Sequence, residues 1–252
     1  MAGDLALSQY VLIAGMSFMA SVIGGVAGYG TGLLMPLVLV PAIGAEAVVP
    51  VISLSALFNN ASRVAAYREL VDWRKAAVIF IAAAPTSVIG AWFYTRLSSA
   101  AAAFLIGAVL IVLVPARRLL RRIDRRIEGR GLVGAGAAYG LIVGGTSGSG
   151  VILLSILLAA GLEGRAVIAT DACVSFGIGI LKTGVFQTAG ALPLSSWIVA
   201  LVMGVAATPG AFVARRLTDG LAAKWHVLIL DAVVVLGGLL LIAQAVRTHL
   251  WP

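Results

Sequence analysis

Residues 24–32 read GGVAGYGTG and interrupt an otherwise apolar run of sequence. A related stretch, GGTSGSG, occupies residues 144–150. When the chain is shifted against itself by 120 residues without a gap, four glycines of the first stretch coincide with four of the second. The same shift aligns Arg96 with Arg216, and each of these arginines precedes a leucine. The sequence therefore indicates a duplicated chain in which each half contains one glycine-rich turn.

The composition is typical of a membrane protein. Of the 252 residues, 61% are hydrophobic and 11% are charged, and the mean hydropathy is +1.09. A chain of this kind has too few polar side chains to cover a water-soluble globule. We predict an all-α integral membrane protein that consists of a single membrane domain.

Each half of the duplication shows five apolar segments. They cover 6–24, 31–43, 47–67, 74–95 and 99–116 in the first half, and 131–144, 150–161, 165–188, 194–214 and 222–246 in the second. The second segment of each half is too short to cross a hydrocarbon core of about 30 Å as a straight helix. We expect the first two segments of each half to form a re-entrant hairpin or helix pair, beside about three full transmembrane helices. The total is eight to ten membrane segments.

A hairpin and a pair of full crossings both return the chain to its starting side. Each half therefore crosses the membrane a net odd number of times, and the two halves have opposite orientations. Inverted repeats of this kind are common in secondary transporters. We place repeat one at 5–116, a basic cytoplasmic linker at 117–130 and repeat two at 131–246.

The basic residues orient the chain. Seven of the eighteen Lys and Arg residues lie in the linker between Arg117 and Arg130. Short basic loops stay in the cytoplasm, where anionic lipid headgroups are their expected neighbours. The N-terminus and the C-terminus are then outside, in a bacterial inner (plasma) membrane, with Arg96 as the main exception. We expect no nucleic-acid partner, because the topology accounts for the net charge of +8.

The glycine-rich turns form the predicted substrate site. Irregular backbone at membrane depth is tolerated only where protein or water satisfies its polar groups. A helix that starts just after such a turn points free N–H groups and a positive dipole end at it, which favours an anion. We assign to this site Gly28, Gly30, Thr31, Gly32, Thr146, Ser147, Gly148, Ser149 and Gly150. The alternative is that the glycines only let helices pack closely.

Polar residues on the third segment of each half extend the predicted site. One helical face of the second half carries Asp171, Ser175, Gly179 and Lys182. The equivalent face of the first half carries Val51, Ser55, Asn59 and Ser62, with Asn60 and Arg63 beside it. From these faces we assign to substrate binding Ser55, Asn59, Asn60, Ser175 and Lys182.

Ionisable residues inside a membrane are costly and are therefore functional candidates. Asp171 is the candidate for coupling to H+ or Na+, and the alternative is an ion pair with a cytoplasmic arginine. Lys182 contacts the substrate or extends its charged end to the membrane surface. Arg63 is interpreted as an interfacial anchor, with attraction of the substrate as the alternative.

Motifs for enzymes and metals are absent from the sequence. It contains no HExxH pattern and no Ser-His-Asp set, and 144–150 lacks the lysine of a phosphate-binding loop. Cys173 is the only cysteine. We expect no enzyme activity, no cofactor and no metal. The oligomeric state, a homodimer included, is left open.

The order of these motifs resembles the sulfite exporter TauE/SafE family of bacterial membrane permeases. The likeness rests on the duplicated turn, on GYGTGLLMPL at 28–37, on Asn59 and Asn60, and on the basic mid-chain linker. It covers nearly the whole chain and implies a multi-pass permease for sulfite, sulfonates or related sulfur-containing or organic anions. We predict a secondary transporter that binds a small anion between two hairpin tips. An anion channel and a membrane subunit without transport activity are the alternatives.

Overall fold

The computed structural model describes residues 5–250 except 28–30, 121–125 and 218–222. These residues form ten α-helices and one short 3-10 turn, η1 (Arg68–Leu70). The first five helices are α1 (Leu7–Ala27), α2 (Thr31–Ile43), α3 (Ala45–Tyr67), α4 (Trp73–Tyr94) and α5 (Ser99–Leu120). The last five are α6 (Arg130–Gly144), α7 (Gly150–Ala159), α8 (Gly164–Thr188), α9 (Leu194–Leu217) and α10 (Ala223–Leu250). The predicted all-α fold and its ten segments are confirmed.

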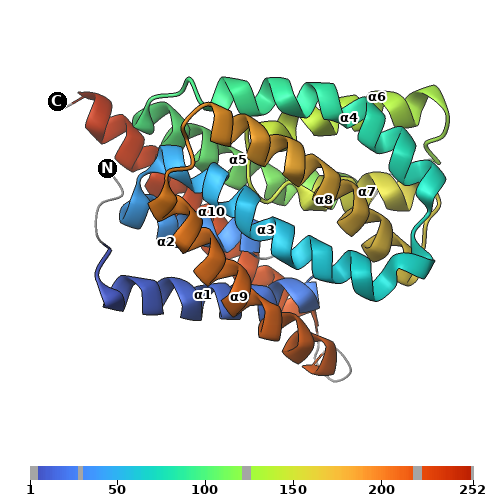
Figure 1. Ribbon diagram of the computed structural model, residues 1–252, viewed down its shortest axis with the longest axis horizontal. Helices are drawn as coiled ribbons and strands as arrows, with labels where there is room; N and C mark the ends of the chain where they lie inside the picture. Colours follow the sequence, from blue (N-terminus) through green and yellow to red (C-terminus); the bar gives the residue numbers. More distant parts are fainter. Residues whose placement is uncertain (1–4, 28–30, 121–125, 218–222, 251–252) are drawn as a thin grey trace.

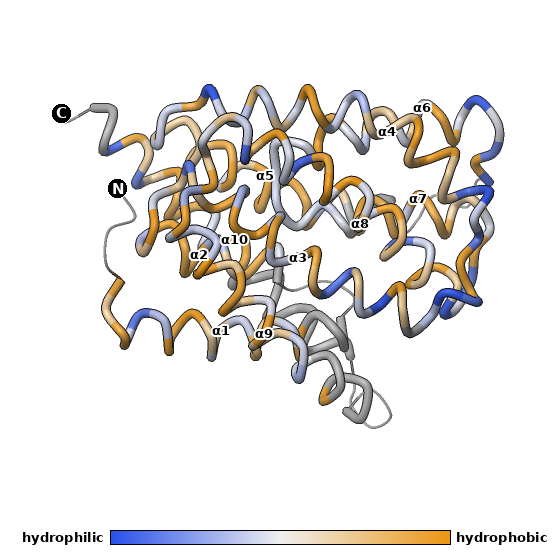
Figure 2. Tube along the Cα trace, in the orientation of Figure 1, coloured by the Kyte–Doolittle hydropathy of each residue, from blue (hydrophilic) through white to orange (hydrophobic). Residues whose placement is uncertain are grey.

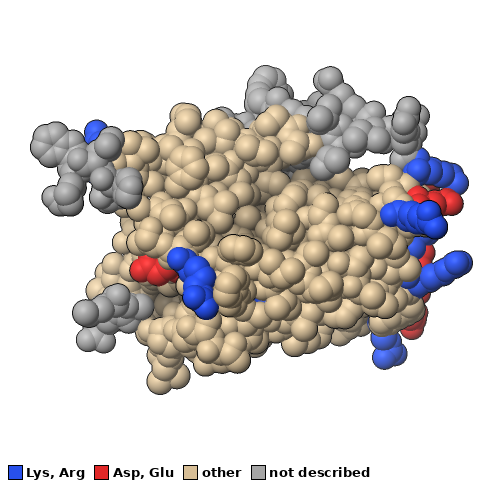
Figure 3. Space-filling model, turned by 90° about the horizontal axis from the view of Figure 1, so that it is seen from above, with Lys and Arg blue, Asp and Glu red and all other residues tan. Residues whose placement is uncertain are grey.

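The surface has the polarity expected of a membrane protein. Among the described residues, α3, α4, α5 and α8 are long and apolar enough to cross a membrane. Large apolar side chains are exposed, for example Ile81 at 69% and Leu240 at 70%. Charged side chains gather toward the two ends of the long axis, with an uncharged band between them (Figure 3). Hydrophilic segments are concentrated at the end opposite the two chain termini (Figure 2). We call this the charged end.

Two helical hairpins enter the molecule from opposite ends. The hairpin α1–α2 has its outer ends near the chain termini, whereas α6–α7 has its outer ends at the charged end (Figure 1). The Ile127 N–H donates a hydrogen bond of 2.8 Å to the Ala159 carbonyl and joins the outer ends of the second hairpin. With 15 residues in α6 and 10 in α7, neither helix of this hairpin can span a bilayer. In the first hairpin the helices are unequal, because α1 has 21 residues and α2 has 13.

The helices pack in pairs that reproduce the duplication. Helix α1 lies along α9, and α6, the counterpart of α1, lies along α4, the counterpart of α9. Helix α3 packs against its counterpart α8, and α5 packs against its counterpart α10. Exchanging every helix for its counterpart therefore leaves the main contacts unchanged. The repeat boundaries at 5–116 and 131–246 remain a prediction.

Glycines bring the backbones of α4 and α6 into contact. A Cβ atom added to Gly140 would lie 2.6 Å from the Ala83 Cα, and one added to Gly144 would lie 2.9 Å from the Gly90 Cα. No real Cβ atom tolerates such distances, so these positions accept only glycine without a shift of the helices. Gly144 therefore allows the close packing of α6 against α4.

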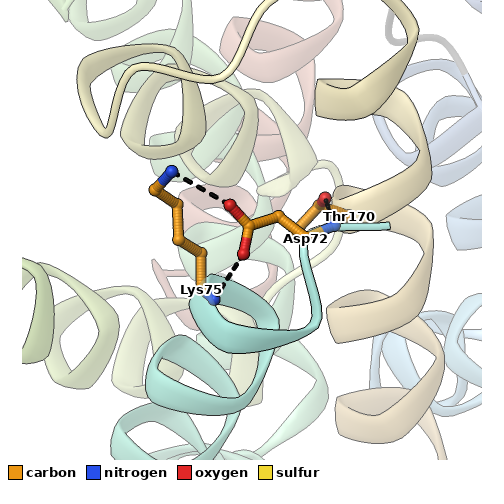
Figure 4. Close-up of polar contacts among 3 residues, drawn as sticks. All are labelled: Asp72, Lys75 and Thr170. Atoms are coloured by element: carbon orange, nitrogen blue, oxygen red, sulfur yellow. Dashed lines mark hydrogen bonds and ion pairs between the residues drawn. The ribbon is translucent and has the colours of Figure 1, made fainter. Parts of the chain in front are cut away.

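A capped helix start fastens α4 to α8 at the charged end (Figure 4). The Asp72 carboxylate accepts hydrogen bonds of 3.0 Å from the N–H and from the Nζ of Lys75. The Asp72 N–H in turn donates to the Thr170 Oγ1 on α8 at 3.0 Å. The hydrogen bond from the Lys75 N–H, assisted by its ammonium group, lowers the pKa of Asp72 below the usual 3.8.

Candidate functional site

A cavity of about 180 Å³ lies where the tip of the second hairpin meets α3 and α8. Its lining combines apolar side chains with hydroxyl, amide and charged groups. The polar side chains are Ser53, Asn59, Asn60, Arg63, Tyr139, Thr146, Ser147, Ser149, Asp171, Ser175 and Lys182. Glycine backbone completes the lining at Gly32, Gly148, Gly150 and Gly179. Most of the predicted site residues are therefore gathered around one space.

The turn between α6 and α7 forms one wall of the cavity. Gly148 has a φ of +81°, which favours glycine because it lacks a Cβ atom. Ser149 is the N-cap residue before α7 and makes no capping hydrogen bond with its side chain, so the N–H groups of Gly150 and Val151 have no partner within the helix. The hydroxyls of Ser147 and Ser149 make no hydrogen bond to another described residue. This wall therefore presents free donors to the cavity.

Thr146 differs from the neighbouring serines. Its Oγ1 donates a hydrogen bond of 2.6 Å to the Ile142 carbonyl, so its single hydroxyl proton is already engaged. The predicted role of Thr146 as a hydroxyl donor is therefore not available in this conformation. Its side chain instead closes the last turn of α6.

Lys182 is buried and holds the end of α6. Only 5% of the residue is exposed, and its Nζ donates to the carbonyls of Val143 and Thr146, the latter at 3.1 Å. A cation at a helix C-terminus is stabilised by the helix dipole. The Lys182 ammonium group therefore does not extend to the membrane surface. Two of its three N–H donors are engaged, so the third can donate to another acceptor.

Asp171 and Arg63 face each other near the charged end of the cavity. The Arg63 Nη1 lies 3.6 Å from the Asp171 Oδ2, and the exposed side-chain fractions are 30% for Arg63 and 7% for Asp171. The second oxygen of Asp171, Oδ1, is buried and accepts no hydrogen bond from the described residues. The structure thus contains an ion pair of Asp171 with an arginine, as in the predicted alternative, while Oδ1 of the carboxylate has no hydrogen-bond partner among the described residues. The cytoplasmic location of this arginine stays a prediction.

The tips of the two hairpins touch at Gly32 and Gly148. A Cβ atom added to Gly32 would lie 2.5 Å from the N atom and 2.6 Å from the Cα of Gly148. Two predicted residues of the first tip, Gly28 and Gly30, lie outside the described residues. Thr31 begins α2, and its side chain is not described. Of the two hairpins, the second therefore supplies more of the described lining.

Helix α3 presents a different face from the one predicted. Its lining residues are Ile52, Ser53, Ala56, Asn59, Asn60 and Arg63. Ser55 is buried elsewhere on the helix and does not line the cavity, and neither do Val51 and Ser62. The prediction assumed that α3 and α8 turn matching faces inward, whereas α3 is rotated so that Asn60 and Arg63 point to the cavity.

Sequence reasoning did not assign Ser53, Arg63 and Tyr139 to the site. Arg63 follows Asn59 and Asn60 by four and three residues, so helical spacing alone could have grouped it with them. Tyr139 lies beside Asp171 and Ser175 and is 1% exposed. Tyr139 lies in a glycine-rich helix, and nothing in the sequence around it predicted a contact with Asp171 or Ser175.

A layer of buried apolar side chains lies on α2 and on the start of α3, outside the lining of the cavity. Met35, Leu39, Val48 and Val49 of this layer are each 0% exposed. Beside them, the ring of Phe186 contacts Tyr94 edge to face with centroids 6.0 Å apart. Arg63, in contrast, lines the cavity. The cavity is therefore bordered by a partly exposed side chain at Arg63, whereas the apolar layer is fully buried.

A comparison with known protein families matches the sulfite exporter TauE/SafE family over residues 13–241. The chain belongs to this family. TauE/SafE proteins are membrane permeases for sulfur-containing anions and are not enzymes, so the protein is a multi-pass membrane transporter. No curated protein and no solved structure gave a match. Within the described ranges, no group of three or more His, Cys, Asp or Glu side chains could hold a metal ion.

Proposed function

We propose that this TauE/SafE protein is a secondary transporter that binds one small sulfur oxyanion, sulfite or a sulfonate, in the cavity at the second hairpin tip. The observation that carries the proposal is the buried ammonium group of Lys182 beside the uncapped start of α7. Both favour an anion, since a helix N-terminus offers free N–H groups and partial positive charge.

The donors around the cavity suit an oxyanion. Hydroxyls of Ser147 and Ser149 and amides of Asn59 and Asn60 surround the space, and each can donate to an anionic oxygen. Among the described lining residues, two cations, Arg63 and Lys182, outnumber the single carboxylate of Asp171 by one charge. The cavity of about 180 Å³ is smaller than the roughly 300–1,000 Å³ of pockets for drug-sized ligands. These features favour a small monoanion.

The buried apolar layer on α2 and α3 favours a transporter over a channel. A conducting channel needs a continuous path, whereas an alternating-access transporter is open to one side at a time. With the charged end in the cytoplasm of a bacterium, as the positive-inside rule favours, the cavity faces inward. The apolar layer then separates the anion from the outside.

Exchange in proteoliposomes tests this function. Purified protein is reconstituted, loaded with unlabelled isethionate and supplied with labelled isethionate outside, and sulfite, thiosulfate, sulfate, taurine and carboxylates serve as competitors. We expect saturable uptake that internal isethionate accelerates, which a channel does not produce. Asn59→Ala should weaken this exchange, whereas Arg96→Gln, at the far end of the molecule, should not. A folded protein that exchanges none of these anions contradicts the proposal.

A further inference from the structure

We propose that Arg63 is shared between Asp171 and the transported anion, and that a proton bound to Asp171 releases Arg63 to the anion. The inference rests on the proposed function and adds its driving ion and a further substrate-binding residue. One proton and one anion then occupy the site together and cross the membrane in the same direction.

The ion pair is placed for such an exchange. Asp171 and Lys182 are eleven residues apart on α8, which is roughly 16 Å along a helix. Lys182 is held at one end of the cavity by two backbone carbonyls, whereas Arg63 at the other end has, within the described part of the chain, a single ionic partner at 3.6 Å. An anion in the cavity therefore lies between a fixed cation and a cation that has another partner.

Competition for Arg63 follows from the charges. While Asp171 is ionised, it holds Arg63, and its own negative charge opposes the anion. Protonation of Asp171 removes both effects, because the neutral carboxyl no longer attracts the guanidinium group. Arg63 can then form the paired hydrogen bonds that guanidinium makes with oxyanions.

The free oxygen of Asp171 offers a place for the proton. Asp171 lines the cavity. Its Oδ1 atom is buried and accepts no hydrogen bond from any described group. A proton on this oxygen changes no existing hydrogen bond. It comes from water at the charged end, where Arg63 is partly exposed, and returns to water after the site opens to the other side.

A metal cation fits this position less well than a proton. Hard cations require several oxygen ligands, and among the described residues Asp171 belongs to no group of three or more His, Cys, Asp or Glu side chains that could hold a metal ion. Arg63 would also repel a second cation at this distance. A proton neutralises the carboxylate without needing further ligands.

Several charged groups besides Arg63 lie near Asp171, so each must be considered as its ionic partner. On the elements that pack against α8, the charged or titratable residues at this end are Arg63 and Tyr67 on α3, Tyr139 on α6, Arg68 and Glu69 on η1, and Asp72, Arg74 and Lys75 at the start of α4. Asp72 and Lys75 pair with each other at 3.0 Å. Helix α7 has no titratable residue. Among the described residues, Arg63 is the ionic partner of Asp171.

Proton movement and anion exchange are measured on the same proteoliposomes. Isethionate is the probe, because a sulfonate stays fully ionised at the pH values used and its own protonation cannot mimic coupling. A pH-sensitive dye inside the vesicles reports protons, and labelled isethionate reports the anion. In the wild type, an inward isethionate gradient should acidify the interior, and isethionate should bind more tightly as the pH falls.

Three variants separate the roles. Asp171→Asn should keep isethionate exchange, lose proton movement and bind isethionate equally well across the pH range. Arg63→Gln should weaken isethionate binding on the order of 5–150-fold, the usual range for coupled sites, and also lose its pH dependence. Glu69→Gln, which removes an exposed carboxylate on η1, should behave like the wild type.

The outcomes distinguish this inference from the proposed function. Isethionate exchange by Asp171→Asn that still moves protons overturns the inference and leaves the transporter in place. Isethionate transport that requires Na+ in place of protons also overturns the inference and leaves the transporter in place. If the folded wild type exchanges no anion at all, the proposed function fails and the inference fails with it.

Discussion

Lys182 shows how one side chain can serve both structure and binding. Replacing it with Met keeps most of the side-chain length but leaves the carbonyls of Val143 and Thr146 without their donor. Loss of a buried hydrogen-bond partner costs about 1–3 kcal/mol. We expect Lys182→Met to lower the stability of the purified protein by this amount in thermal unfolding, and to abolish stabilisation by isethionate.

Asn59→Ala provides the matched comparison. The Asn59 side chain lines the same cavity but makes no hydrogen bond to a described residue. Its removal should weaken the effect of isethionate while leaving the stability of the empty protein nearly unchanged. Equal destabilisation by both variants would show that Lys182 has no special structural role.

Asp72 gives a prediction with a defined pH dependence. Because folding lowers its pKa below 3.8, the ionised carboxylate stabilises the folded state at higher pH, and this contribution disappears as the pH falls through the lowered value. Asp72→Ala should cost about 0.5–2 kcal/mol near neutral pH, as for other lost helix caps. The difference from the wild type should shrink in acid below pH 3.8.

Glu163 is the control for this measurement. It is also an acidic residue at the start of a helix, α8, but its side chain makes no capping hydrogen bond. Unfolding of Glu163→Ala should therefore differ little from the wild type. A pH-independent loss of stability in Asp72→Ala would mean that the ionised carboxylate is not what stabilises the start of α4.

At the scale of elements, the contact of α4 with α6 depends on glycine. Gly140→Ala should destabilise the protein by about 1–3 kcal/mol, the usual cost of overpacking, because the new Cβ atom meets the Ala83 backbone. Gly134→Ala in the same helix should instead be neutral or stabilising by up to about 1 kcal/mol, since nothing lies within 4 Å. Thermal unfolding of both variants checks the opposite signs.

The helices were predictable from the sequence, because an apolar run in a membrane protein has few alternatives to a helix. The face of α8 was predictable too, since Asp171, Ser175, Gly179 and Lys182 all line the cavity. The face of α3 was not, because a rotation by one residue is about 100° and depends on the helices that surround it. Ser55 was misplaced for this reason. Residues on the first hairpin tip, Gly28 and Gly30, stay a prediction.

At the scale of the whole molecule, labelling at the two ends of α8 tests how the protein is oriented in the membrane. Single cysteines in place of Glu163 and Ala189, both exposed, are made in a Cys173→Ala background. In intact cells, a maleimide that does not cross membranes should label Ala189→Cys, and Glu163→Cys should react only after the membrane is opened. The reverse pattern would place the charged end outside and would contradict the positive-inside interpretation.

The pairing of α3 with α8 and of α5 with α10 bears on the ancestry of the chain. Each of these contacts joins a segment to its own counterpart, as in a two-fold dimer, where the same patch meets itself. A single repeat could therefore assemble with a second copy that lies upside down in the membrane. Joining the two copies through a basic linker fixes which one faces which way. If the predicted inverted repeat holds, the present protein corresponds to an antiparallel dimer whose two subunits are joined in one chain.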